Sequence, residues 1–262
     1  MLDYILQGFE LRSIEMKNLK TIAVFALALG LLSAPLFAAD DALTKLPFAK
    51  KLQLAKAGDP DAKMAVGEAY EKGQGVLSSG SNAAKWYREA ALVGNVEAQF
   101  RLAKLVSTGA PGLKVDKPTA LKLLEAAAKR GHAPSQNLYG LMLQNGDGLV
   151  KDEKQAVEWY RKAADQGLAV AQNNLGVMVL NGTGTTRSVD EAFQLFSKGA
   201  KGKDAWAMNN LGGMYEMGWG TTKDLEKAKA YYKQAATDGN AIAVKNLARL
   251  GVVWPETTAL KP

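Results

Sequence analysis

The sequence predicts an all-α fold, a solenoid of stacked helical hairpins, from features that repeat every 36 or 37 residues. The first is a small residue, found at Ala62, Ala98, Ser135, Ala171, Ala207 and Ala243. The second is a bulky pair, found at Trp86-Tyr87, Leu123-Leu124, Trp159-Tyr160, Leu195-Phe196 and Tyr231-Tyr232. A Gly-x-Gly turn between them is the third, in all units but the second, where Gly109-Ala-Pro-Gly112 adds one residue. Self-similarity at this period is typical of solenoids and arrays.

The composition is that of a folded chain without thiol groups. With 47% hydrophobic and 23% charged residues, the 262-residue chain is neither disordered nor a membrane bundle. The absence of cysteine excludes disulfides, thiolate metal sites and cysteine nucleophiles. The formal charge of +7 favours acidic partners. Because the lysines and arginines are scattered and form no basic stripe, we expect no binding to nucleic acid.

The N-terminal segment is typical of export. Residues 16–39 have a positive start, an apolar stretch at Thr21–Leu32 and a small-residue exit suited to cleavage after Ala38 or Ala39, which predicts a signal peptide. Residues 1–15 precede it with acidic residues that a leader does not need, so we interpret them as a mis-assigned extension. The alternative is an uncleaved anchor. Either way the repeats lie outside the inner membrane, and after cleavage no membrane insertion is expected.

The remaining chain divides by the period. Residues 40–58 fill the place of a second helix and predict an N-terminal capping helix. A C-terminal capping helix is predicted at 240–251, and a loose tail at 252–262. The region 59–239 holds five repeats, with approximate bounds 59–94, 95–131, 132–167, 168–203 and 204–239.

Each repeat predicts two helices. Counting from the small residue as position 0, positions 0, 4, 8 and 11 form one apolar stripe on the first helix. Position 5 is often glycine, which costs ~1 kcal/mol against alanine inside a helix and is explained by close approach of the partner helix. Gly-x-Gly then ends the first helix. Second helices are predicted to begin at residues able to cap them, near Ser81, Asp116, Asp152, Ser188 and Asp224.

This pattern, A-x-x-x-L-G-x-x-Y-x-x-G-x-G followed by the aromatic pair, Ala-Ala and Gly, resembles the Sel1-like repeat from about Pro60 to Gly239. The resemblance implies a right-handed superhelix of antiparallel helix pairs that acts as a scaffold for a protein or peptide. Exported bacterial members of similar layout include periplasmic negative regulators that bind the sensor domain of an envelope histidine kinase. Cysteine-rich members have been described as β-lactamases or penicillin binders, but this chain has no cysteine.

Residues suited to catalysis are scarce. The single histidine, His132, has no second histidine or cysteine to share a metal with. Neither Ser-x-x-Lys nor Gly-x-Ser-x-Gly occurs, so no acylating serine is recognisable. We therefore expect no enzymatic activity, no cofactor and no metal. The alternative is a hydrolase acting on cell-wall or β-lactam substrates, which a carboxylate pair such as Glu68 and Glu71 beside a deep pocket would support.

One face of the first helices predicts partner binding. Positions 2, 6 and 9 lie opposite the apolar stripe, yet they become apolar or amide-bearing in the third and fourth repeats. Amides can pair with an extended peptide, and apolar neighbours can anchor it. The candidate partner-binding residues are Asn137, Leu141, Asn173, Val177, Leu180, Asn209 and Trp219. Two alternatives remain: asparagines at position 3 that belong to the repeat pattern and fix the turns between helices, and a Trp219 that folds back over its own turn.

The function predicted from these features is an exported, periplasmic or secreted scaffold that binds a protein or peptide. The resemblance narrows this to a regulator of an envelope signalling receptor. We expect a monomer, and self-assembly through the C-terminal half-repeat is a third hypothesis.

Overall fold

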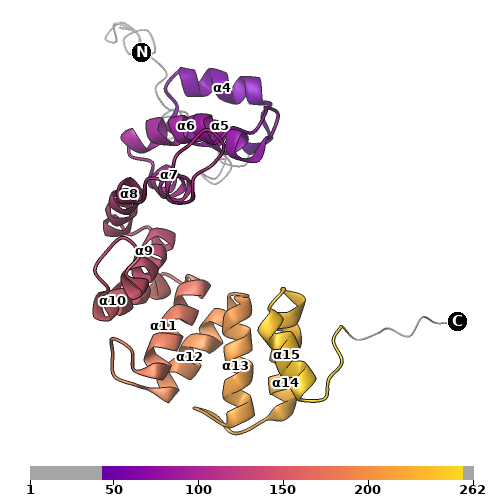
Figure 1. Cartoon of the computed structure of the whole chain (residues 1–262). Coiled ribbons are helices and arrows are strands. Elements are labelled where there is room, and N and C mark those ends of the chain that lie inside the picture. The colour runs from indigo at the N-terminus through magenta and orange to yellow at the C-terminus, as the bar shows by residue number, and fades with distance from the viewer. Residues whose placement is uncertain (1–42, 256–262) are drawn as a thin grey trace, which may run out of the picture. The chain divides into compact units, whose positions relative to one another are not determined.

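The computed structural model of the chain describes residues 43–255. The predicted signal peptide (16–39) and extension (1–15) therefore lie outside the described residues, as do residues 40–42 of the N-terminal cap and 256–262 of the tail. The described residues form helices joined by short turns (Figure 1), and their extended pairing is limited to an isolated antiparallel bridge between Ala110 and Leu113. The fold-class prediction of an all-helical hairpin solenoid is confirmed.

The chain divides into two compact units, Met1–Ala120 and Leu121–Pro262. In the first unit α4 packs against α5, α5 against α6, and α6 against α7. Since each pair of consecutive helices is joined by a short turn, these contacts are those of helical hairpins. The bounds are Phe48–Lys56 for α4, Pro60–Lys72 for α5, Gly80–Leu92 for α6 and Val96–Thr108 for α7.

The second unit repeats this arrangement, and α8 (Lys117–Lys129) contains the point where the units divide. From α9 to α15 each helix packs against the next, and α11 also packs against α13, so first helices of successive repeats are neighbours (Figure 1). The first helices are α9 (Ala133–Asn145), α11 (Ala169–Asn181), α13 (Ala205–Met217) and the shorter α15 (Ala241–Arg249). The second helices are α10 (Glu153–Asp165), α12 (Val189–Lys201) and α14 (Leu225–Thr237). Within residues 43–255 no helix has the length and hydrophobicity that crossing a bilayer requires.

Side-chain caps fix where the second helices begin. In α10, α12 and α14 the side chains of Asp152, Ser188 and Asp224 accept hydrogen bonds from the backbone N–H three residues later, as predicted. The predicted start near Ser81 is wrong by two residues. The cap of α6 is Ser79, whose Oγ accepts a 3.3 Å bond from the N–H of Asn82. The extra residue of the second repeat lies after Ser79, so this cap is 37 residues before Asp116, not 36.

The glycines inside the first helices allow the close approach of the partner helix that was predicted, and the groups that approach are aromatic rings. A Cβ added to Gly176 would lie 2.7 Å from the ring of Phe196, and one added to Gly212 would lie 2.8 Å from that of Tyr232. Cβ atoms in proteins essentially never approach a non-bonded heavy atom this closely. In the second repeat, where the bulky pair is Leu123-Leu124, the corresponding position is Ala103 and not glycine.

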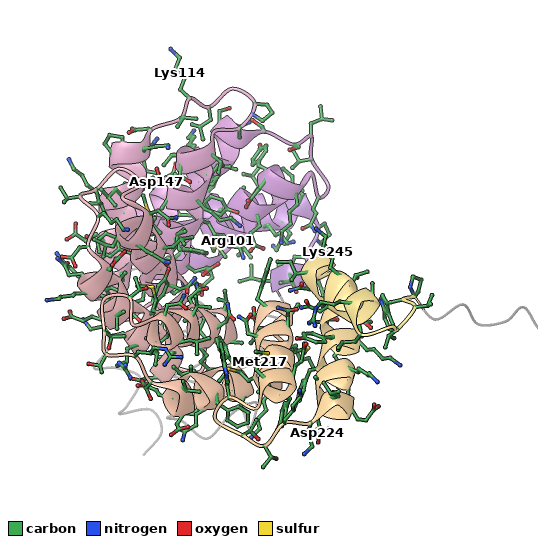
Figure 2. The ribbon with its side chains drawn as sticks, turned by 60° about the horizontal axis from the view of Figure 1, so that its bottom comes forward. Arg101, Lys114, Asp147, Met217, Asp224 and Lys245 are labelled. Carbon is green, nitrogen blue, oxygen red and sulfur yellow. The ribbon has the colours of Figure 1, made fainter. Side chains whose placement is uncertain are left out.

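The turns follow the predicted glycine chemistry with two local departures. Gly73, Gly146, Gly182 and Gly218 end α5, α9, α11 and α13 in the left-handed conformation, with φ between 69° and 73°. The second repeat ends α7 differently: Gly109 has ψ 166°, and the longer turn forms the Ala110–Leu113 bridge, beyond which Lys114 projects outward (Figure 2).

The second departure is at the end of the fourth repeat, where Lys203 takes the left-handed conformation with φ 63°. The other repeats place glycine here, for example Gly167 and Gly239. The glycine of the fourth repeat is one residue earlier, at Gly202, where a Cβ would lie 2.6 Å from that of Ala169. Close packing against α11 therefore accounts for the shifted glycine.

Candidate partner-binding surface

In the second unit, charged residues are concentrated in the second helices and are nearly absent from the first helices α9, α11 and α13. Helices α9 and α11 contain no Asp, Glu, Lys or Arg, and α13 contains only Glu216. The second helices α10, α12 and α14 carry many charges of both signs, as do α5 and α7 in the first unit. We call the solvent-facing side chains of α9, α11 and α13 the neutral surface.

The one carboxylate of these helices is already neutralised. Arg249 of α15 donates two hydrogen bonds to Glu216, of 2.6 and 2.7 Å, and the hydroxyl of Tyr232 donates a third of 2.8 Å. The bonds from Arg249, followed by that from Tyr232, lower the pKa of Glu216 although its partial burial acts in the opposite direction. Glu216 therefore stays ionised and paired, and it leaves the neutral surface without an uncompensated charge.

A chain of asparagine side chains connects the first helices. Between helices the amide of Asn174 donates to the carbonyl of Asn137 at 2.9 Å, Asn210 to Asn173 at 2.8 Å, and Asn246 to Asn209 at 3.0 Å. Within α11 and α13 the neighbouring asparagines are joined by 3.4 Å bonds, from Asn173 to Asn174 and from Asn209 to Asn210. We call these six residues the asparagine ladder.

The ladder shows what the amides do in the absence of a partner. Asn173 and Asn209 are 7% and 8% exposed, so their side chains mainly link neighbouring repeats. The ladder uses one N–H and one carbonyl lone pair of each amide in its interior, which leaves a second N–H and a second lone pair. Asn137, Asn174, Asn210 and Asn246 are half-buried, so their side chains are more accessible to solvent than those of the buried Asn173 and Asn209.

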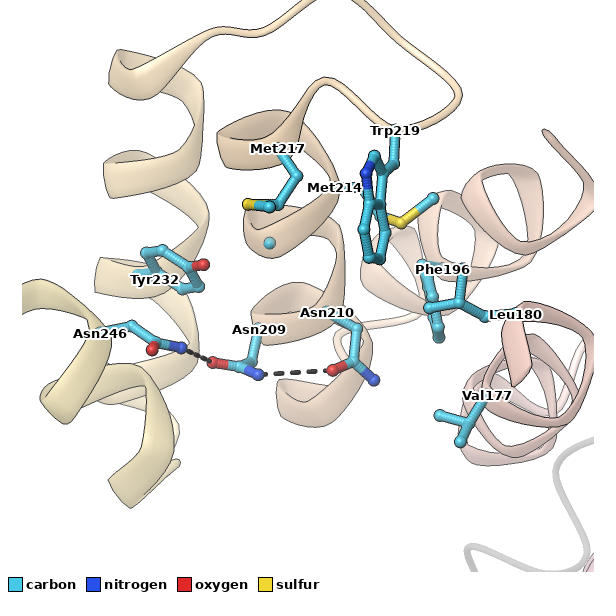
Figure 3. A pocket seen from close by; sticks show the side chains of 11 residues that line it. Val177, Leu180, Phe196, Asn209, Asn210, Met214, Met217, Trp219, Tyr232 and Asn246 are labelled. Carbon is cyan, nitrogen blue, oxygen red and sulfur yellow. Dashed lines mark hydrogen bonds between the residues drawn. The ribbon is translucent and has the colours of Figure 1, made fainter. Parts of the chain in front are cut away.

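A pocket of about 300 Å³ opens beside the ladder, between α11 and α13. The candidates Val177, Leu180, Asn209 and Trp219 line it together with residues that were not predicted. In Figure 3 the asparagines follow one edge, Val177 and Leu180 lie on the side of α11, and Met217 and Trp219 lie at the opposite end. The additional lining residues are Phe196, Asn210, Gly213, Met214, Met217, Tyr232 and Asn246.

The apolar wall of this pocket comes from a paired change in the fourth repeat. In three other repeats a buried tyrosine of the second helix donates its hydroxyl to the side chain 16 residues earlier: Tyr87 to Glu71, Tyr160 to Gln144, and Tyr232 to Glu216. In the fourth repeat the corresponding residues are Phe196 and Leu180. Hydroxyl and acceptor are both absent there, so the pocket wall is apolar at this place.

The exposed rim of the pocket could have been recognised from the sequence. Met217 and Trp219, on either side of Gly218, are 58% and 42% exposed. The corresponding turns of the first, third and fourth repeats carry polar residues on both sides of the glycine: Lys72 and Gln74, Asn145 and Asp147, Asn181 and Thr183. Two exposed apolar side chains where other repeats are polar are the signal that identifies Met217.

The other candidates lie outside the pocket. Asn137 and Leu141 belong to α9, where Leu141 is 37% exposed, and Asn173 lies in the ladder on α11. Of the candidates, Asn137, Leu141, Val177 and Leu180 belong to the neutral surface, Asn173 and Asn209 are buried in the ladder beneath it, and Trp219 lies in the turn after α13. Four of the candidates, Val177, Leu180, Asn209 and Trp219, meet at one pocket.

The residues of the alternative catalytic hypothesis have counter-ions. A guanidinium nitrogen of Arg101 lies 2.9 Å from a carboxylate oxygen of Glu68, another lies 3.9 Å from Glu71, and Tyr87 donates its hydroxyl to Glu71. A hollow of about 300 Å³ borders Glu68, but Glu71 is not part of its lining.

His132 precedes α9, and its Nδ1 lies 2.9 Å from the Oγ of Ser135. The described part of the chain contains no group of three or more His, Cys, Asp or Glu able to hold a metal.

Comparison with known proteins gives a consistent result for the repeat region. The family model for the Sel1 repeat matches residues 60–95, 96–132, 133–168, 169–204 and 207–240. No curated protein matches the chain.

Solved bacterial structures share the fold. A Sel1 repeat protein from Oxalobacter formigenes is 30% identical with a TM-score of 0.70, over 78% of this chain and 89% of that one. A protective antigen of uropathogenic Escherichia coli strains, displaying an SLR fold, is 27% identical with a TM-score of 0.70 over 79% of this chain. This chain spans 45% of that antigen. An immunity protein from Pseudomonas aeruginosa is similar in fold alone, at 23% identity and a TM-score of 0.51 over 73% of this chain and 70% of that one.

Proposed function

Because the chain belongs to the Sel1 repeat family, we propose that it is an exported scaffold that binds a protein or peptide partner on the neutral surface of α9, α11 and α13. The repeat architecture supports this proposal, since stacked helical repeats present extended surfaces used for binding. The charge separation in the second unit favours these helices over the others as the binding surface.

The neutral surface is the observation on which the proposal depends. Ordinary solvent-facing helices carry charges, as α10, α12 and α14 do. Helices α9 and α11 expose Leu141 and half-expose Val177 instead, beside unionised amides. Depletion of charge with exposed apolar and aromatic groups is characteristic of the centre of protein interfaces, because a desolvated charge costs free energy there.

The place of action is also part of the proposal. Residues 16–39 support export by their signal-peptide pattern. The narrower form of the proposal is that the partner is the sensor domain of an envelope signalling receptor, which the protein regulates from the periplasm. Its support is the resemblance to exported regulators with the same repeats.

The test replaces two apolar residues of the neutral surface by carboxylates. We expect Leu141→Asp combined with Val177→Asp to abolish capture of partner from an envelope extract, because two charges would have to be desolvated at the interface. The helical circular dichroism and the melting temperature should stay near those of the unchanged protein.

A control variant places one such carboxylate elsewhere in the second unit. Val150 is 89% exposed in the turn before α10, away from the neutral surface, so Val150→Asp should leave capture intact. Equal capture by the double variant and the control would contradict the proposal. A large loss of stability in the double variant would instead place Leu141 and Val177 in the core.

A further inference from the structure

We propose that the pocket between α11 and α13 binds one uncharged apolar side chain, of leucine or phenylalanine type, from an extended segment of the partner. This inference rests on the proposed function and specifies the chemistry of the partner. The residues that decide it are Leu180, Phe196, Asn210, Met217, Trp219 and Asn246.

Electrostatics selects an uncharged occupant. No Asp, Glu, Lys or Arg lines the pocket. Glu216, the carboxylate on the same helix, is occupied by Arg249 at 2.6 and 2.7 Å and by Tyr232. A charged side chain entering the pocket would lose hydration and find no counter-ion, which is strongly unfavourable.

The size of the pocket fits a side chain better than a cofactor. Its volume of about 300 Å³ is at the lower end of the range of about 300–1,000 Å³ that is usual for small-molecule sites. Leu180, Phe196 and Met214 provide apolar walls, and Met217 and Trp219 stand exposed at one end (Figure 3). The flexible thioether of Met217 can adapt to the shape of an incoming side chain.

The amides at the edge explain why the occupant belongs to a peptide. Asn210 and Asn246 are half-buried on the pocket lining, and each uses its amide once as a donor in the ladder. Each retains a second N–H. The main-chain carbonyls that flank a peptide side chain can accept these bonds, which a plain hydrocarbon ligand cannot do.

The pair Phe196 and Leu180 sets the selectivity. The third repeat has Tyr160 and Gln144 in the same places, joined by a 2.7 Å hydrogen bond. Phe196→Tyr with Leu180→Gln would build this pair into the pocket wall, using a combination that the fold already accommodates. Polar groups would then replace apolar contact area, so affinity for an apolar side chain should fall.

The experiment uses capped amino acids as probes of the purified protein. N-acetyl-leucinamide and N-acetyl-phenylalaninamide should shift the NMR signals of the Trp219 indole N–H and the side-chain amides of Asn210 and Asn246. N-acetyl-lysinamide and the α-amide of N-acetyl-aspartic acid, whose side-chain carboxylate is free, should bind at least about tenfold more weakly, because their charge finds no counter-ion. Equal binding of charged and apolar probes, or no binding of the apolar ones, would overturn the proposal.

Paired variants separate the pocket from the rest of the surface. Phe196→Tyr/Leu180→Gln should weaken the apolar probes by about tenfold or more, since pocket contacts of this kind are worth ~1–3 kcal/mol. Tyr160→Phe/Gln144→Leu, the reverse exchange in the third repeat, should leave probe binding unchanged. If the first pair lowers the melting temperature, Trp219→Ser repeats the test at an exposed position. Unchanged probe binding in Phe196→Tyr/Leu180→Gln and in Trp219→Ser would also overturn the proposal.

The outcomes distinguish this inference from the proposed function. If Phe196→Tyr/Leu180→Gln still captures partner and Leu141→Asp/Val177→Asp does not, the scaffold function stands and the pocket inference fails. Light scattering tests whether a second copy of this chain is the occupant. Dimerisation of the unchanged protein that Phe196→Tyr/Leu180→Gln abolishes would overturn the choice of a separate partner.

Discussion

The backbone conformation of Lys203 is unfavourable for a residue with a side chain. Lys203 is the only non-glycine residue at positive φ in the described part of the chain. A side chain in the left-handed conformation costs roughly 1–2 kcal/mol, and glycine avoids this cost but loses more chain entropy on folding. We expect Lys203→Gly to raise the free energy of unfolding by about 0.5–1 kcal/mol in urea denaturation.

The reverse exchange is the control for Lys203. Gly167 holds the equivalent position at φ 87°, and a Cβ there would meet nothing within 4 Å. Gly167→Lys should therefore lower stability through the backbone alone, by roughly 1 kcal/mol. A loss of stability in Lys203→Gly would mean that the lysine side chain contributes more than its backbone costs.

Single-residue predictions from the sequence were sound where chemistry is local. The glycines that end the first helices follow from backbone sterics. The caps at Asp152, Ser188 and Asp224 follow from a hydrogen bond between the cap side chain and the backbone N–H three residues later. The asparagine ladder was beyond such reasoning. Its bonds join residues 37 positions apart on different helices, one more than the period. Finding them requires the offset between neighbouring helices, which the repeat pattern does not specify.

Helix pairing depends on matching glycine with an aromatic ring. Intrinsic propensity alone predicts that Gly176→Ala stabilises α11 by ~1 kcal/mol. The added Cβ would lie 2.7 Å from the ring of Phe196, so we expect destabilisation by about 1–3 kcal/mol instead. Combining it with Phe196→Leu reproduces the Ala103 and Leu124 of the second repeat, and this should recover part of the loss.

A double-mutant cycle in urea measures this coupling. The two changes should be non-additive, with the double variant more stable than the sum of the single effects predicts. Additive losses would show that α11 and α12 adjust independently. Ala103→Gly in the second repeat is the control, because there a leucine replaces the ring and propensity alone should decide, at a cost of ~1 kcal/mol.

At the level of helices, the sequence located part of the candidate site. Val177 and Leu180 were chosen because they interrupt the polar side of the first helices, and both line the pocket. The reason for Leu180 could not be read from its own helix. It replaces the acceptor of a tyrosine hydroxyl, and this becomes visible only when Tyr160 and Gln144 are seen paired across two helices.

Export is a prediction that concerns the whole chain. When the chain is produced from Met16 in a bacterial host, we expect the protein to appear in the periplasmic fraction. Its mature N-terminus should be Ala39 or Asp40, because the small residues before these positions suit the signal peptidase. Intact mass spectrometry of that fraction measures this. A periplasmic protein that keeps residues 16–39 would favour the anchored alternative.

The separation of charge between first and second helices has a kinetic consequence. A neutral docking surface exerts little long-range attraction, so the association rate should be near the unsteered range of about 10⁵–10⁶ M⁻¹s⁻¹. Added salt should act on that rate only through the net charge of +7 on the whole protein, since the docking surface itself contributes almost no Coulomb attraction to screen. Specificity would then depend on how slowly the complex dissociates, and the protein would keep its partner as the ionic strength around it changes.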